Sequence, residues 1–360
     1  MPHIFAFTSM LFTFFMAGCK DGPVDPPPPP PPEKKWEEIT MFKNADIRYM
    51  IQHKGVLYVS TYISIPTKDS TANVLYKTED GIKWDTLKTF AITIGPIAFN
   101  GDTLTILESG RTWKYHPTFG WKMFWEHLIA ADHTQDMVWL NDQLFVFDFN
   151  FGLVYSKDTV RVMRDLFIEP SVSKFVKHTY QGKEVFYTRP FYVYEDKIYR
   201  FNGSSFETVM NGISTDENKR ANYPAMYVHN DTFYAGFNTS SRIKKLVNDV
   251  WVNVADTIPN TPHANLFSPN LINRPTSIVF HKNRMFVGTE WTGVLKWTDS
   301  VWVSISNGLR LEFPDYPQYE LYSAVVQLES FRGKLFVAYG EPWFAPGSGR
   351  GKGIFYYTFE

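Results

Sequence analysis

The sequence contains little that could cross-link the chain or give it a strong charge. Only one of its 360 residues is a cysteine, Cys19, so no intramolecular disulfide can form and the core alone must stabilise the fold. The 36 lysines and arginines nearly balance the 37 aspartates and glutamates, which leaves a formal net charge of -1. Nucleic-acid binding depends on clustered positive charge, so we expect no nucleic-acid partner.

Motifs of catalytic and metal-binding chemistry are missing as well. The sequence has no HExxH, no paired CxxC, no glycine-rich phosphate loop and no nucleophile elbow. His53, His229 and His281 share one position of a repeated segment, which predicts separate structural roles rather than a metal cluster, and His263 stands alone in a long loop. We therefore predict no catalytic residue, no metal site and no cofactor.

The amino terminus has the pattern of an exported protein. Ile4–Met16 is almost wholly apolar, too short to span a bilayer but long enough for the core of a signal peptide. It ends in Met16-Ala17-Gly18-Cys19, which resembles the lipobox of bacterial lipoproteins. The resemblance implies that residues 1–18 are a signal peptide and that a lipid on Cys19 attaches the protein to a membrane.

A proline-rich segment follows the cysteine. Pro26–Pro32 are seven consecutive prolines, which form an extended rod of roughly 20 Å. Residues 19–35 are therefore expected to be a stalk. Lys20-Asp21 resembles the charged signal of surface-exposed lipoproteins of the Bacteroidetes, which implies an outer-membrane lipoprotein that faces the periplasm or the cell surface.

Residues 36–360 contain seven copies of an apolar run, a polar turn and a second apolar run. Glycine, asparagine and aspartate tolerate the positive φ of tight hairpin turns, so each copy predicts two antiparallel strands. The predicted turn dipeptides are Lys54-Gly55, Asn100-Gly101, Asn141-Asp142, Gln181-Gly182, Asn230-Asp231, Lys282-Asn283 and Arg332-Gly333. A third short run follows each hairpin, and in six copies a fourth run begins at once, usually with a large aromatic residue.

This repeat predicts an all-β fold, a single seven-bladed β-propeller of four-stranded blades. The repeat length is about 46 residues, within the range of propeller blades. Aromatic residues, 17% of the chain, suit the wide gaps between packed sheets. The seventh copy lacks a fourth run, and Trp36-Glu37-Glu38-Ile39-Thr40 has the missing form. We expect residues 36–40 to close the ring as the outer strand of the last blade.

One turn resembles a known structural motif. Thr78, Asp80, Gly81 and Trp84 lie in TEDGIKW, which resembles the Asp-box, or BNR repeat, of sialidase-like propellers, and Trp297–Trp302 is a degenerate copy. In that family the aspartate holds the turn and the aromatic residue packs between sheets. The resemblance therefore implies a structural role for these four residues.

The long connections all fall on one face of the predicted ring, where function usually resides on a rigid scaffold. Aromatic rings beside carboxylates and an arginine suit the recognition of a glycan, a peptide or an envelope protein. The candidate binding residues are Glu290, Trp291, Arg310, Asp315, Tyr316, Tyr319, Glu341, Trp343 and Phe344. An alternative is that these loops merely pack on one another.

Three functions fit this pattern. The first is a membrane-anchored, monomeric, non-catalytic binding or scaffold module. The second is a sialidase-like glycoside hydrolase, for which Arg189, Arg274, Arg310, Asp315, Tyr316 and Glu341 supply suitable residue types, although the Arg-Ile-Pro signature is missing. The third is an assembly factor of the cell envelope. We expect the non-catalytic module.

Overall fold

A computed structural model describes most of the chain from Trp36 onward, and residues 34–360 form one compact unit. The residues described are 36–43, 45–65, 70–126, 134–148, 152–156, 159–162, 172–190, 196–212, 225–237, 241–259, 273–290, 292–309, 324–340 and 351–359. The predicted signal peptide, Cys19 and the proline-rich stalk lie outside these residues. Their roles remain predictions from the sequence.

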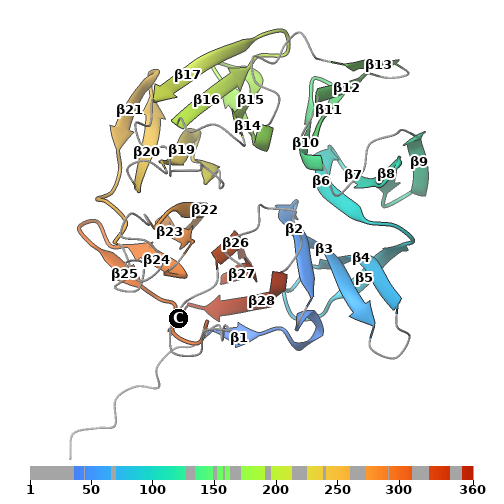
Figure 1. The fold of residues 1–360 in the computed structure, drawn as a ribbon, viewed down its shortest axis with the longest axis horizontal. Coiled ribbons are helices and arrows are strands. Elements are labelled where there is room, and N and C mark those ends of the chain that lie inside the picture. The colour runs from blue at the N-terminus through green and yellow to red at the C-terminus, as the bar shows by residue number, and fades with distance from the viewer. Residues whose placement is uncertain are drawn as a thin grey trace, which may run out of the picture. The chain divides into compact units, whose positions relative to one another are not determined.

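The described residues form seven four-stranded antiparallel sheets, which we call blades and number in chain order (Figure 1). Blade 1 contains β2 (Asp46–His53), β3 (Val56–Ile65), β4 (Ser70–Thr78) and β5 (Asp85–Phe90). Blade 2 contains β6 (Ile94–Asn100), β7 (Thr103–Glu108), β8 (Arg111–His116) and β9 (Gly120–Glu126). Blade 3 contains β10 (Thr134–Leu140), β11 (Gln143–Asp148), β12 (Gly152–Ser156) and β13 (Thr159–Val162).

The other blades follow the same order. Blade 4 contains β14 (Val172–Tyr180), β15 (Lys183–Pro190), β16 (Asp196–Phe201) and β17 (Phe206–Gly212). Blade 5 contains β18 (Met226–His229), β19 (Thr232–Phe237), β20 (Arg242–Val247) and β21 (Val250–Asn253). Blade 6 contains β22 (Pro275–His281), β23 (Arg284–Thr289), β24 (Val294–Trp297) and β25 (Trp302–Ser304). Blade 7 contains β26 (Ala324–Phe331), β27 (Lys334–Gly340), β28 (Gly351–Thr358) and β1 (Glu37–Glu38).

The innermost strands form a closed ring around a central channel. Each innermost strand contacts the next in the order β2, β6, β10, β14, β18, β22 and β26, and β26 contacts β2. The two ends of the propeller meet in blade 7, where Glu37 pairs with Tyr356 and Glu38 with Phe355. The first residues of the propeller are therefore hydrogen-bonded to its last strand.

The predicted extent of this closing strand was wrong. We expected residues 36–40 to be extended, but only Glu37–Glu38 form a strand and a 3-10 turn, η1 (Thr40–Phe42), follows almost at once. The turn buries Phe42 completely against blade 1, where its ring lies edge-on to Trp84 with centroids 4.8 Å apart. Continuing the strand would have left this aromatic side chain without its packing site.

The hairpin turns follow from local backbone preferences. Both residues of six predicted dipeptides have positive φ, as in Lys54 (46°) and Gly55 (75°), which matches the twist of the flanking strands. The prediction for blade 2 was wrong by one residue. Asn100 pairs with Thr103 there, so the turn is Gly101-Asp102, with positive φ at Gly101.

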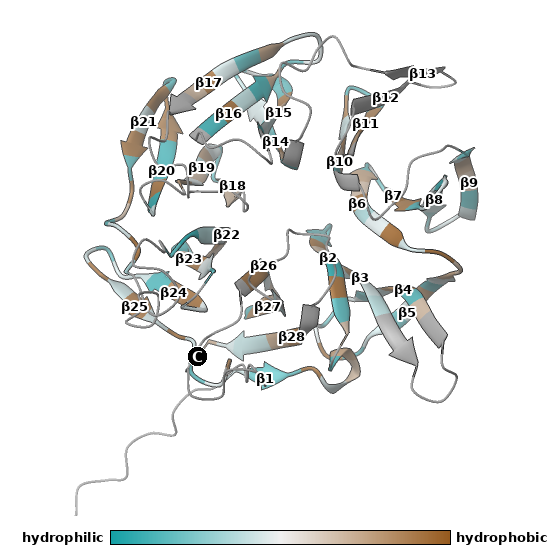
Figure 2. Cartoon of the chain, viewed as in Figure 1, coloured by the Kyte–Doolittle hydropathy of each residue, from teal (hydrophilic) through white to brown (hydrophobic). Residues whose placement is uncertain are grey.

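The core is divided among the interfaces between blades. Within the described part of the chain, seven clusters of buried apolar residues occur, and each joins two neighbouring blades. In the cluster between blades 3 and 4, for example, Phe145 and Phe186 lie 5.4 Å apart. Figure 2 shows hydrophobic and hydrophilic segments interspersed along the coloured strands.

Candidate functional site

A β-bulge redirects side chains on several innermost strands. In β2, β10, β22 and β26 the pairing register shifts by one residue near the start of the strand. The residues that directly follow the shift are Tyr49, Asp136, Ser277 and Gln327. Bulges commonly re-aim side chains near functional sites, and all four residues make hydrogen bonds to another blade.

Asp136 is the most deeply buried of these polar groups. Its carboxylate accepts hydrogen bonds from the hydroxyl of Tyr49 (2.6 Å), the backbone N–H of Met137 (2.8 Å) and that of Phe175 (2.7 Å). Burial raises the pKa of Asp136 to about 6, although the three donors oppose the shift. The same burial, together with the negative charge of Asp136, raises the pKa of the Tyr49 hydroxyl.

Gln327 and Ser277 join neighbouring blades in a similar way. The amide oxygen of Gln327 accepts the backbone N–H of Met50 at 2.7 Å, and the hydroxyl of Ser277 accepts that of Leu328 at 3.1 Å. A backbone N–H can only donate, so the oxygen of Gln327 must face Met50 and its amide nitrogen must point elsewhere. Gln327 also lines the cavity described next, and no hydrogen bond of this nitrogen is found among the described residues.

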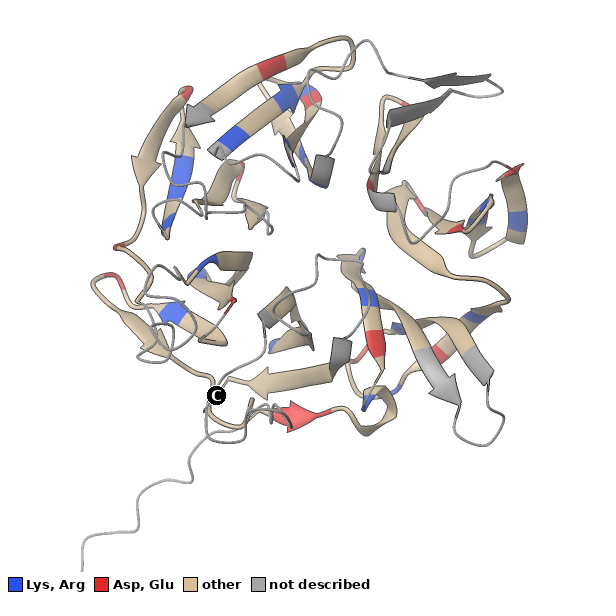
Figure 3. Cartoon of the chain, viewed as in Figure 1, with Lys and Arg blue, Asp and Glu red and all other residues tan. Residues whose placement is uncertain are grey.

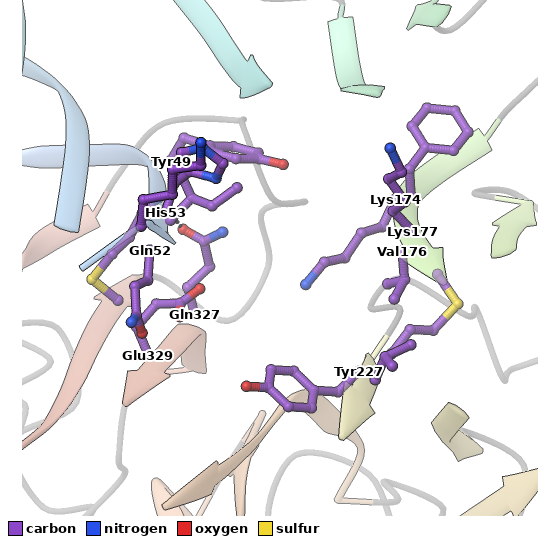
Figure 4. Close-up of a pocket in the computed structure, with 15 residues that line it drawn as sticks. Tyr49, Gln52, His53, Lys174, Val176, Lys177, Tyr227, Gln327 and Glu329 are labelled. Carbon is purple, nitrogen blue, oxygen red and sulfur yellow. Dashed lines mark hydrogen bonds between the residues drawn. The ribbon is translucent and has the colours of Figure 1, made fainter. Parts of the chain in front are cut away.

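The central channel contains a cavity of about 420 Å³. Residues from β2, β14, β18 and β26 line it, so blades 1, 4, 5 and 7 all contribute. Lys174 and Tyr227 extend into the space that separates them from Tyr49, Gln327 and Glu329 on the opposite side (Figure 4). Five polar side chains from four strands therefore surround one cavity of ligand size.

The pKa of Glu329 is raised further than that of Asp136. It lies two residues beyond Gln327, on the same face of β26, and no hydrogen bond of its carboxylate is found among the described residues. Removal from bulk water raises the pKa of Glu329 to about 8, and the positive charge of Lys174 only partly opposes this shift. Glu329 is thus mostly protonated at pH 7. Burial, and secondarily Glu329, raises the pKa of Tyr227 to about 12.

A second cavity, of about 280 Å³, lies between blades 4 and 5. Arg200 contacts two residues that line this cavity: it pairs with Asp249 at 2.9 Å and stacks on the ring of Tyr180. It also pairs with Glu207 at 2.8 Å. Figure 3 shows an acidic segment on β17 beside the basic segments of β16, and another at the turn between β20 and β21. Because Arg200 already has these partners, we assign the cluster to blade packing.

Most of the loop residues predicted to bind a ligand lie outside the described residues. These are Trp291, Arg310, Asp315, Tyr316, Tyr319, Glu341, Trp343 and Phe344, and their roles stay predictions. Glu290 is described, and it is 3% exposed. Its carboxylate lies 3.4 Å from the guanidinium of Arg274, so Glu290 is paired within the protein.

The turn that resembles an Asp-box has a compact hydrogen-bond pattern. Asp80 accepts the hydroxyl of Thr78 at 3.1 Å and the backbone N–H groups of Ile82 and Lys83 at 2.8 Å each. These bonds lower the pKa of Asp80. Trp84 packs against the cluster between blades 7 and 1. The geometry gives the turn a local structural role.

The three histidines of the repeated position each stack on an aromatic ring. The distances between ring centroids are 4.0 Å for His53 and Phe99, 4.1 Å for His229 and Phe280, and 4.4 Å for His281 and Phe359. Every one of these contacts joins different blades or reaches the carboxyl terminus. The prediction that they are separated in the fold is confirmed, since they lie in blades 1, 5 and 6. In the part of the chain that the structure describes, no group of acidic, histidine or cysteine side chains is placed to hold a metal ion.

Sequence reasoning missed the channel residues because it looked for function in long loops. A usable signal existed, since Asp136, Gln327 and Glu329 interrupt apolar runs that predict innermost strands. A polar residue in such a run must face the channel or a neighbouring blade. The cavity therefore lies on the rigid strands of the propeller rather than on its predicted loop face.

No protein-family model matches this sequence, and no curated protein is similar to it. Solved structures are similar in fold. An extracellular domain from B. thetaiotaomicron has a TM-score of 0.60 at 10% identity, over 91% of this chain and 40% of the other. This chain thus spans about two fifths of that relative.

Two further structures share the fold at low identity. PorZ of Porphyromonas gingivalis, a surface component of the type IX secretion system, has a TM-score of 0.51 at 15% identity, over 87% of this chain and 46% of PorZ. The WD40 β-propeller domain of Doa1 has a TM-score of 0.52 at 11% identity, over 88% of this chain and 94% of that domain. At such low identities these similarities show a β-propeller and nothing finer. Among the described residues, no helix is long and apolar enough to cross a bilayer.

Proposed function

We propose that this protein is a non-catalytic binding module whose β-propeller holds a small ligand, or a terminal group of a glycan or peptide, in its central channel. The cavity of about 420 Å³ carries the proposal, since polar groups of Lys174, Tyr227, Gln327 and Glu329 line it. Lys174, Tyr227 and Glu329 have no hydrogen-bond partner among the described residues, so a ligand would satisfy them. The innermost strands hold these groups rigidly, which favours binding by preorganisation.

We further propose that the module acts outside the cytoplasm, attached to the outer membrane through a lipid on Cys19. The sequence Met16-Ala17-Gly18-Cys19 and the proline-rich stalk support this location. Fold similarity to an extracellular domain and to a bacterial surface component agrees with it. The partner would be a glycan, a peptide or an envelope protein, and the module would act as a monomer.

The hydrolase alternative gains no support from the described residues. It needs several arginines that converge on one substrate carboxylate. Arg189 is buried and donates to the carbonyl of Gly236 at 2.9 Å, while Arg274 pairs with Glu290. Neither guanidinium lines the channel cavity.

Thermal-shift and calorimetric binding to a panel of mono- and disaccharides and di- and tripeptides tests the channel as a site. We expect at least one compound to raise the melting temperature of the protein and to lose most of its affinity in Tyr227→Phe, which removes only a hydroxyl. Lys183→Met is the control, because Lys183 is exposed on blade 4 outside the cavity. Equal binding by Tyr227→Phe and the parent protein would contradict a channel site. Hydrolysis of a fluorogenic glycoside would contradict a non-catalytic function.

A further inference from the structure

Among the described residues that line the channel cavity, one lysine has no ion pair. Three lysines line the cavity: Lys54, Lys174 and Lys177. Lys54 forms an ion pair with Asp102 at 2.6 Å, and Lys177 forms one with Glu184 at 2.6 Å. Lys174 has no ion pair among the described residues, and Figure 4 shows its ammonium group in the middle of the channel. An ammonium group in this position attracts an anion from the ligand.

Neighbouring groups add donors rather than acceptors. The amide oxygen of Gln327 is held by the N–H of Met50, and no hydrogen bond of its amide nitrogen is found among the described residues. The hydroxyl of Tyr227 also points into the cavity, and its pKa of about 12 keeps it a donor at all ordinary pH values. Three donors from β14, β18 and β26 therefore face one space, the arrangement that binds carboxylate oxygens.

Both acidic groups near the cavity are compatible with an anionic ligand. Asp136 directs its oxygens to Tyr49, Met137 and Phe175, so its hydrogen bonds lie within the wall of the channel. Glu329 holds a proton at pH 7, since its pKa is about 8, and a protonated carboxyl group is itself a hydrogen-bond donor. The net charge facing the ligand at pH 7 thus comes from Lys174.

We propose that the ligand of the channel carries a carboxylate, which binds between Lys174, Tyr227 and Gln327 with the Glu329 carboxyl group as a further donor. This inference rests on the proposed binding function and specifies the chemical class of its ligand. Suitable compounds are small monocarboxylates, such as uronic acids or the free carboxyl end of a peptide. The cavity of about 420 Å³ falls within the usual range of small-molecule sites.

Paired compounds test this class directly. The probes are D-glucuronate, D-galacturonate and N-acetylated amino acids, each measured by calorimetry beside its uncharged carboxamide. We expect at least one acid to bind about tenfold or more tightly than its amide. Lys174→Met should abolish the difference, whereas the matched control Lys183→Met should retain it.

The pH dependence supplies a second readout. Glu329 must be protonated to donate, so affinity for the acid should fall about tenfold between pH 7 and pH 9 as this group ionises. Tyr49, Lys174 and Tyr227 interact electrostatically with Glu329, and Lys174 also interacts with Asp136. Asp136, with a pKa of about 6, is already ionised at pH 7, and Tyr227 remains protonated at pH 9. Glu329→Gln keeps a neutral donor and should bind the acid at pH 7 while losing the pH dependence.

The outcomes separate the two proposals. If sugars or peptides bind in the channel but acids and amides bind equally, the carboxylate inference is overturned and the binding function stands. The inference also fails if Lys174→Met keeps the preference for acids, or if cationic compounds bind best. If no acid, amide, sugar or peptide binds, both proposals are overturned.

Discussion

The hydroxyl of Tyr49 in blade 1 donates a 2.6 Å hydrogen bond to the buried carboxylate of Asp136 in blade 3, which lies 87 residues later in the chain. Blade 2 lies between these blades in sequence, and its innermost strand contacts both of theirs. Asp136 also accepts the backbone N–H of Phe175 in blade 4. One carboxylate thus connects three blades at the wall of the channel.

Removing the Tyr49 hydroxyl should destabilise the propeller. Tyr49→Phe leaves Asp136 with two donors instead of three, and a hydrogen bond to a charged group contributes about 1.5–3 kcal/mol. We expect the free energy of unfolding, measured in urea, to fall by about 2 kcal/mol. Tyr58→Phe is the control, since no hydrogen bond of the Tyr58 hydroxyl is found among the described residues. Similar losses in the two variants would argue against a special role for the Tyr49–Asp136 pair.

Glu329 should make the protein less stable as the pH rises. Its pKa is about 8 in the folded state and near 4.5 in the unfolded chain, so between these values only the folded state retains the proton. Stability therefore decreases from about pH 4.5 to pH 8, by at most about 1.4 kcal/mol per pH unit, and is constant for this group above pH 8.

Glu329→Gln tests that pH dependence. The variant should gain stability over the parent protein, with a gain that grows from pH 5 to pH 8 in thermal melts. Glu79→Gln, at an exposed position, serves as the matched control. A gain that is constant over this range would show that Glu329 titrates normally.

Gly81 should tolerate no side chain. A Cβ atom there would lie 2.8 Å from the ring of the fully buried Phe336, and φ is +73°. We expect Gly81→Ala to cost about 2–4 kcal/mol, from overpacking and backbone strain together. Gly120 has almost the same φ, +72°, but open space around it, so Gly120→Ala should cost only about 1 kcal/mol. Equal costs would mean that packing against Phe336 contributes nothing.

Trp36 should be essential for closing the ring. It is 4% exposed, packs 5.4 Å from Tyr357, and donates its indole N–H to the carbonyl of Ile305 at 2.6 Å. We expect Trp36→Ala to lower the free energy of unfolding by about 3–5 kcal/mol, as for other large buried aromatic residues. Met41→Ala, at a position 40% exposed, should cost less than about 1 kcal/mol. Hydrogen exchange should then show β28 opening first; unchanged protection there would contradict the closing role.

The hairpins could be predicted from the sequence because their causes are local. Dipeptides such as Asn141-Asp142 and Asn230-Asp231 accept positive φ, and the apolar runs beside them pair at once with their neighbours. The one misplaced turn, at Gly101-Asp102, shows the limit of this reasoning. Both Asn100-Gly101 and Gly101-Asp102 are acceptable turn dipeptides, and only the pairing of Asn100 with Thr103 decides between them.

The sequence by itself therefore determined the hairpins, the separation of the repeated histidines and the residues of the Asp80 turn. Tertiary structure alone decided the channel, because its polar groups come from strands as distant as β2 and β26. The protonation state of Glu329 also depends on the fold. The residues next to it in sequence would leave its pKa near 4.5, and the burial that comes with closure of the ring raises it.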